Sequence, residues 1–145
     1  MTGPTYGVLT DHLHLQDIVD VAPGRLTAKG RFRCFLMGGV HETRTEPTRI
    51  PGQFWEGGVY ENEYIRESGV WKIKVLNYNL AWQAEYEKGW AHSAIKLLMV
   101  SPFTKTFPED PRGPDELKPA GQFKFWPDAF FVPFHYPHPV SGKEG

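Results

Sequence analysis

Residues 55–82 constrain the fold most strongly, because they carry the pattern of two neighbouring β-strands. The runs 59–65 and 70–75 are rich in β-branched and aromatic residues, which suit a pleated and half-buried surface. Residues 67–69 (Glu-Ser-Gly) lie between the two runs and favour a tight turn. The stretch therefore predicts a β-hairpin at the centre of the fold.

The second run of this hairpin alternates between apolar and basic residues. Trp71, Ile73 and Val75 share one predicted face, and Lys72 and Lys74 share the other. An uncovered apolar sheet face invites aggregation. We therefore expect the C-terminal tail or another chain to cover Trp71 and its two apolar neighbours.

Another strand is predicted near the N-terminus. Residues 10–21 alternate, which places His12, His14, Gln16 and Ile18 on one face. Two histidines on the same face of one strand are candidates for proton transfer or for binding.

A third run of alternating residues follows at 26–39, after turn-forming residues at 22–24. It pairs with the preceding strand as an antiparallel hairpin. Residues 40–51 are polar and turn-rich, which predicts an exposed loop. Together with the central hairpin, these runs predict four antiparallel strands in chain order.

Residues 82–100 leave a helix and a short strand open as alternatives. Gly89 interrupts the helical pattern, and residues 96–100 would also fit a strand. The residues with helical spacing are Trp82, Tyr86, Trp90 and Ala94.

The C-terminal part is rich in both proline and aromatic residues. Nine of the thirteen prolines lie between Pro102 and Pro139, which disfavours a regular helix or a central strand. Disordered segments are poor in aromatic residues, so we expect an extended tail that packs on something. We therefore divide the chain into a sheet domain, residues 1–100, and a tail, residues 101–145, that packs on the sheet or on a partner chain.

Composition excludes several classes of function. The chain has 145 residues and a net charge of -1, so nothing indicates binding to nucleic acid or to an anionic membrane. No apolar run approaches the length of a membrane-spanning helix, and no signal peptide is visible. The single cysteine, Cys34, excludes an internal disulfide and predicts a cytoplasmic protein.

The order of these features is similar to that of a known family. A histidine-bearing strand, a turn and a second strand are followed by WEGGVYENEY and GVWKI. Over residues 8–92 this pattern resembles the SnoaL-like group of the nuclear transport factor two-like superfamily. The proline-rich tail also resembles the C-terminal extension of some members of that group.

The resemblance implies an α+β fold that is mostly β here. In the family, a curved antiparallel sheet forms a cone around N-terminal helices, and a hydrophobic pocket lies between them. This sequence departs from the pattern because strand-like residues begin by Val8, so we expect the N-terminal helices to be missing from it. Three readings stay open: a truncated chain, cover by a partner chain as in a homodimer, or cover by the tail. We favour cover by the tail or by another chain.

Family activities include dehydratases, isomerases, cyclases and aldol-type lyases, and most members use no metal. The resemblance therefore implies a cofactor-independent enzyme that acts on a small hydrophobic, oxygenated ring substrate by general acid–base catalysis. His12 matches the histidine that faces the pocket in many members, and its side chain suits proton transfer at neutral pH. Tyr60 would stabilise the developing oxyanion. A non-catalytic ligand-binding or subunit-assembly module, or a remnant of a longer enzyme, is the alternative.

The other predicted site residues would line the substrate pocket. Asn62 and Tyr64 alternate with Tyr60 along the third strand and share its face. No third ligand accompanies the two histidines of the first strand, so no metal site is predicted. The substrate-binding candidates are His14, Cys34, Asn62, Tyr64, Trp71 and Asn77.

Charged residues on the second and third strands predict cross-strand ion pairs on the outer face. Arg31 and Arg33 would face Glu61 and Glu63 in the expected register. We interpret these residues as a charge ladder, at a dimer contact or, less favoured, at an anionic-substrate site.

Overall fold

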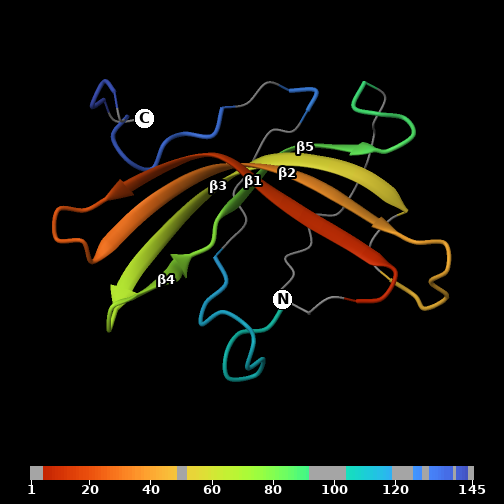
Figure 1. Ribbon diagram of the computed structural model, residues 1–145, viewed down its shortest axis with the longest axis horizontal. Coiled ribbons are helices and arrows are strands. Elements are labelled where there is room, and N and C mark those ends of the chain that lie inside the picture. The colour runs from red at the N-terminus through yellow and green to blue at the C-terminus, as the bar shows by residue number, and fades with distance from the viewer. Residues whose placement is uncertain are drawn as a thin grey trace.

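The computed structural model describes residues 5–48, 52–91, 104–118, 126–128, 131–138 and 140–143 (Figure 1). Within these residues the protein consists of antiparallel β-strands and irregular segments, without a helix. The predicted fold class, a mostly β chain with a curved antiparallel sheet, is confirmed. The strands are β1 (Val8–Val21), β2 (Thr27–Val40), β3 (Gln53–Glu67), β4 (Val70–Val75) and β5 (Tyr78–Glu85).

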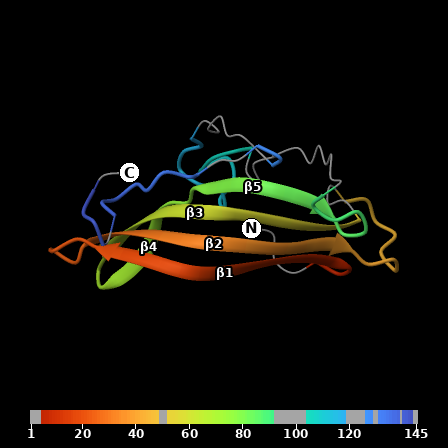
Figure 2. The ribbon, with the colours of Figure 1, turned by 90° about the horizontal axis from the view of Figure 1, so that it is seen from above.

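The strands form one sheet in the order β1-β2-β3, with β4 and β5 both paired to the far edge of β3 (Figure 2). β4 pairs with the C-terminal part of β3, and β5 pairs with its N-terminal part. The prediction of four strands was therefore wrong by one. β5 is a separate strand because the chain bends at Leu76 and Asn77 and then continues along β3.

The predicted tight turn between the third and fourth strands is present. Ser68 and Gly69 both have positive φ, at 49° and 83°, as a two-residue type I′ turn requires. This turn matches the right-handed twist of the flanking strands, so it holds β3 and β4 in antiparallel register.

Three register shifts interrupt the strand pairing, and two of them lie in the pairs β1–β2 and β3–β5. In β1, Gln16 has φ 49°, and the pairing with β2 shifts between Leu15 and Ile18. A second shift lies in the pairing of β3 with β5, at Gly57 and Gly58. Bulges of this kind bend strands and increase their twist. The sheet is visibly arched as a result (Figure 1).

We call the face that carries Cys34 and Tyr60 the concave face, and the face that carries Arg31 and Glu61 the convex face. His12 and His14 pair with Leu36 and Cys34 and lie on the concave face, as predicted. Ile18 pairs with Arg31 and lies on the convex face. The prediction that Ile18 shares the face of His12 was wrong, because the bulge at Gln16 reverses the alternation.

A similar shift changes the faces of β4. Ile73 pairs with Tyr64 whereas Val75 pairs with Glu63, and these neighbours on β3 point to opposite faces. Val75 therefore leaves the face that Trp71 and Ile73 share. Trp71 is 42% exposed and Ile73 59% exposed, so their apolar surface is open in the described part of the chain.

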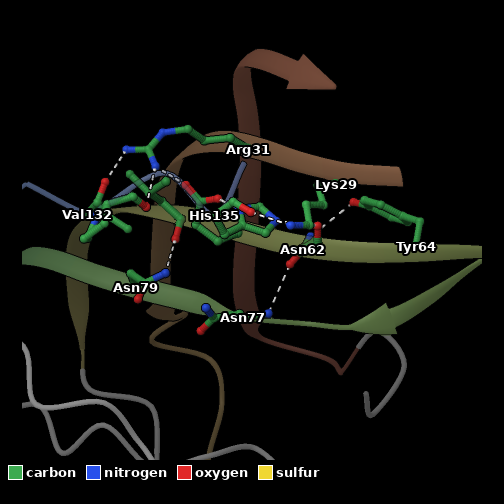
Figure 3. Close-up of polar contacts among 11 residues, drawn as sticks. Lys29, Arg31, Asn62, Tyr64, Asn77, Asn79, Val132 and His135 are labelled. Carbon is green, nitrogen blue, oxygen red and sulfur yellow. Dashed lines mark hydrogen bonds and ion pairs between the residues drawn. The ribbon is translucent and has the colours of Figure 1, made fainter. Parts of the chain in front are cut away.

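Residues 131–138 lie on the convex side of the arch (Figure 1). The guanidinium of Arg31 donates to the carbonyl of Val132 at 2.9 Å, and Nζ of Lys29 donates to the carbonyl of His135 at 2.6 Å (Figure 3). The Glu61 carboxylate pairs with both Arg31 and His135. This segment of the tail thus contacts β2 and β3 of the same chain.

The predicted charge ladder is half right. Arg31 lies opposite Glu61 and pairs with it, as expected. Arg33 lies opposite Val59, and Lys29 lies opposite Glu63, so the prediction that Arg33 also faces a glutamate was wrong. An antiparallel register that matched both pairs would set Arg31 against Glu63 and Arg33 against Glu61, and the observed register is offset from it by two residues.

Residues 82–91 do not form a helix. Trp82 belongs to β5, and turns follow from residue 86 to residue 91. Trp82 packs edge-on against Trp90, with ring centroids 6.1 Å apart. Helical spacing failed as a guide here because Trp82 is held by pairing with β3. The predicted boundary at residue 100 and the alternative strand at residues 96–100 lie outside the described residues.

Candidate active site

Polar and aromatic side chains gather at the middle of the concave face. They come from four strands that pair side by side, so that residues far apart in sequence become neighbours. One row across the sheet runs His12, Leu36, Glu56 and Gln83, and the next runs His14, Cys34, Gly58 and Leu80. Their floor is the hydrophobic cluster of Cys34, Leu36, Tyr60, Phe32, Phe54 and Tyr78.

His12 and Tyr60, the two predicted catalytic residues, are in contact. Nδ1 of His12 lies 3.1 Å from the Tyr60 hydroxyl, within hydrogen-bond distance. Sγ of Cys34 lies 3.8 Å from the same nitrogen. The Tyr60 ring reaches toward β1 and packs against His14, with ring centroids 4.7 Å apart. The structure therefore brings together four of the predicted site residues.

Gly58 allows the Tyr78 ring to lie across the middle of this site. A Cβ at position 58 would come within 2.7 Å of that ring and 2.5 Å of the Asn79 carbonyl oxygen. The Tyr78 ring also packs against Tyr60, with centroids 4.6 Å apart. The buried Tyr78 hydroxyl has no hydrogen-bond partner of good geometry, although Glu56 and Cys34 are its polar neighbours.

Glu56 is the buried charge of the site. Glu56 is only 8% exposed, and its carboxylate accepts a hydrogen bond from Nε2 of Gln83. Burying a carboxylate is costly unless hydrogen bonds or opposite charges compensate for lost water. Sequence reasoning missed both residues. Glu56 lies four residues before Tyr60 on the same strand, so simple alternation could have found it, whereas Gln83 lies beyond the bulge at Gly57 and Gly58.

Burial sets the protonation of the site. It lowers the pKa of His12 from 6.5, an effect that the nearby Glu56 charge opposes. Burial also raises the pKa of Tyr60 to about 12, raises that of Tyr78 further, and raises that of the Cys34 thiol. At neutral pH the imidazole is therefore uncharged and able to accept a proton, whereas both phenols and the thiol keep theirs.

Three other predicted residues form a structural cluster at the bend between β4 and β5 (Figure 3). The Asn62 side chain, 2% exposed, donates to the Tyr64 hydroxyl at 3.2 Å and accepts from the backbone N–H of Asn77 at 3.1 Å. Both ends of the Asn62 amide are thereby occupied. Asn77 contributes its backbone and is otherwise exposed. Trp71 lies on β4, which pairs with the opposite end of β3 from β5, and makes none of these contacts.

No group of three or more His, Cys, Asp or Glu side chains that could hold a metal ion occurs among the described residues. His12 and His14 share a face, and the side chains in contact with them there are those of Tyr60 and Cys34. Nor do the residues that the structure describes include a helix with the length and apolarity needed to span a membrane.

Comparison with known protein families agrees with this architecture. A family model of the SnoaL-like domain matches residues 2–77, which cover β1 to β4. The chain belongs to the SnoaL-like domain family. That family includes polyketide cyclases and isomerases. No curated protein matches the chain.

In this SnoaL-like chain, the matched region contains most of the concave site. His12, Cys34, Glu56 and Tyr60 all fall within it, and Tyr78 and Gln83 follow directly on β5. The tail residues that contact the convex face lie outside the match. The candidate active site therefore lies mostly within the region that the family model matches.

Proposed function

We propose that this protein is a cofactor-independent enzyme of lyase or isomerase type, such as a dehydratase, cyclase or aldol-type lyase. The observation that carries the proposal is the His12–Tyr60 pair, with Nδ1 and the hydroxyl 3.1 Å apart on an aromatic floor. A neutral imidazole beside a protonated phenol supplies a proton acceptor and a hydrogen-bond donor together. The apolar surroundings suit a small hydrophobic, oxygenated ring substrate.

One tautomer of His12 makes this pair bifunctional. When Nδ1–H of His12 donates to the Tyr60 oxygen, Nε2 keeps its lone pair and the Tyr60 O–H can donate elsewhere. Nε2 then takes a proton from the carbon next to a substrate carbonyl. The electron pair moves to the carbonyl oxygen, where the Tyr60 O–H stabilises the negative charge. Return of the proton to another atom of the substrate completes an isomerisation.

Variants at these two positions test the proposal. His12→Ala should lower turnover of a hydroxylated or carbonyl-bearing ring substrate by at least about 100-fold, the typical contribution of a positioned acid–base group. Tyr60→Phe should lower turnover while leaving substrate binding nearly unchanged. His41→Ala, on the exposed loop after β2, is the matched control. Full turnover by the His12 variant would overturn the assignment.

A second candidate is assembly of two copies of this chain through the edge of the sheet. Among the described residues, β1 pairs with β2 alone, so its other edge presents unpaired backbone groups. Leu13 and Leu15 on this strand are 40% and 47% exposed. An antiparallel contact of β1 with its own copy would satisfy both features with two-fold symmetry. Light scattering should then report a dimer that Leu13→Lys dissociates, and a monomeric wild type would exclude it.

The buried thiol of Cys34 supports a cytoplasmic location, because a reducing compartment keeps such a group reduced. The proposed compartment is tested by locating the full-length protein in fractionated cells. Recovery from a membrane or secreted fraction would contradict it.

A further inference from the structure

Residues 131–138 of the tail meet the convex face through a histidine whose two ring nitrogens both lie against acceptors. Nδ1 of His135 contacts Oε2 of Glu61, and Nε2 lies 3.3 Å from the backbone carbonyl oxygen of Asn62. A carbonyl oxygen only accepts hydrogen bonds, so Nε2 must carry a hydrogen to bind it. A neutral imidazole has a single N–H, and the contact with Asn62 already uses it. A neutral His135 therefore has no hydrogen to donate to Glu61.

We propose that the contact between His135 and Glu61 holds one extra proton, which makes the attachment of residues 131–138 to the sheet pH-sensitive. The pair takes up this proton when the segment attaches and releases it when the segment detaches. The attachment is therefore strongest at low pH and weakens as the pH rises. His135 lies on the face opposite to His12, so this proposal does not depend on the reaction proposed above.

The number of protons does not depend on which atom carries the extra one. If the Glu61 carboxylate is ionised, Nδ1 of His135 needs a proton to donate to it, and the imidazole becomes positively charged. If Nδ1 keeps a lone pair, Oε2 of Glu61 needs the proton to donate to Nδ1. Without a proton on either atom, two lone pairs would face each other, which is repulsive. The contact thus requires one proton more than a neutral imidazole and an ionised carboxylate hold together.

Burial prevents solvent from replacing this proton. Nδ1 of His135 and Oε2 of Glu61 are both buried and have no hydrogen-bond partner elsewhere among the described residues. The other carboxylate oxygen of Glu61, Oε1, accepts from the Arg31 guanidinium. Leaving a buried polar atom without a partner is costly, so the attached segment favours the protonated pair.

The other charged groups around the pair do not supply the missing hydrogen. Nζ of Lys29 donates to the backbone carbonyl of His135, and the Arg31 guanidinium donates to Oε1 of Glu61 and to tail carbonyls. The positive charges of these two residues oppose a charge on the imidazole, but their hydrogens go to other atoms. The remaining titratable groups are Asp20 of β1, Glu63 of β3, and Tyr136 and His138 of the tail.

His138, in the same segment, has the opposite arrangement. Its Nδ1 accepts from the backbone N–H groups of Val140 and Ser141, both at 3.2 Å. Acceptance requires a lone pair on Nδ1, so these contacts fit a neutral imidazole and take up no proton. His138 is therefore the matched control for His135.

Limited proteolysis of the full-length protein measures the attachment. Chymotrypsin cleavage after Phe134 is followed from about pH 6 to pH 9, and each rate is divided by that of a free peptide of residues 131–143 in the same buffer. The divided rate follows the detached fraction when opening and closing are fast. Free histidine titrates near pH 6.5, so uptake of one proton on attachment should raise this rate above that pH, by at most about tenfold per pH unit. We expect a rise of at least about threefold between pH 6 and pH 8.

Two variants should abolish this rise in different ways. His135→Asn has no group at this place that takes up a proton near neutral pH. Glu61→Gln provides an N–H for Nδ1, so a neutral His135 satisfies both contacts. His138→Asn should keep the rise. A flat profile for the wild type, a rise retained by either folded variant of the pair, or its loss in His138→Asn would overturn the proposal.

Discussion

The ion pair between Arg31 and Glu61 should be the main attachment of the tail to the sheet. The two side chains are 13% and 4% exposed, and the Arg31 guanidinium also donates to the carbonyls of Val132 and Pro133. It lies 4.4 Å from the centroid of the Phe134 ring, a cation–π contact. Arg31→Met removes all these contacts while keeping the apolar stem of the side chain.

The expected loss follows from the burial of the pair. Removing one partner of a buried ion pair costs about 3–5 kcal/mol, because the other charge is left without compensation. Glu61 also lies against Nδ1 of His135, which compensates the carboxylate charge only in its protonated form, so the whole of this range applies. Domains of this kind unfold with about 5–15 kcal/mol, so Arg31→Met should remain folded but be clearly weakened.

Urea unfolding measures this loss, and Lys72→Met provides the control. Lys72 pairs with Glu67 at 2.6 Å, but the two side chains are 57% and 52% exposed, so the pair contributes about 0–1 kcal/mol. Chymotrypsin reports the tail directly, because cleavage after Phe134 requires residues 131–138 to detach. Arg31→Met should be cut there faster than the wild type. Equal unfolding free energies for the two variants, with unchanged cleavage, would refute the reasoning.

Three further predictions concern the concave site. Gly58→Ala should lower the free energy of unfolding by about 1–3 kcal/mol, because its Cβ would lie 2.7 Å from the Tyr78 ring; Gly24→Ala, with open space around it, is the control in thermal denaturation. The folded pKa of Tyr60, about 12, exceeds the unfolded value of about 10, so its contribution is complete below about pH 10 and is lost as the pH rises through about 12. Urea unfolding across that range should therefore weaken the wild type more than Tyr60→Phe, and parallel losses would count against the burial of the phenol. Cys34 is 5% exposed and its thiol pKa is raised, so iodoacetamide should label it much faster after unfolding; equal rates would contradict its place in the core.

The strands were predictable because alternation is a local property of the sequence. Residues 59–65 and 70–75 alternate, and their turn residues Ser68 and Gly69 accept the positive φ that a short hairpin demands. β5 was missed for a physical reason. Its aromatic residues have a spacing that also fits a helix, and the chain reaches β3 again only through the bend at Asn77. Pairing with β3 decides between helix and strand for these residues, and a single sequence does not show that pairing.

Part of the site was predictable for the same reason. Tyr60 and His12 were placed on the inner face by alternation and by family resemblance, and the structure brings them within 3.1 Å. Asn62 also lies on that face, but its amide is occupied by the bend between β4 and β5. Whether a side-chain amide is already hydrogen-bonded depends on which backbone groups need partners in the folded sheet. The hydrogen bonds of Asn62 could therefore not be predicted from the sequence.

Two of the bulges connect the curvature of the sheet with the composition of the site. One lies in β1 at Gln16, just after His12 and His14, and the other lies in β5, where Ala81 is the extra residue opposite Gly57 and Gly58. Each reverses the alternation of its own strand at the border of the site, whereas β3 keeps its alternation from Glu56 to Tyr60. The bends that make the face concave thus also decide which polar side chains reach it. We infer that deleting Gln16 would restore the regular pairing of β1 and flatten the sheet beside His12. The distance between Nδ1 and the Tyr60 hydroxyl would then lengthen, because Tyr60 reaches β1 only across a curved floor.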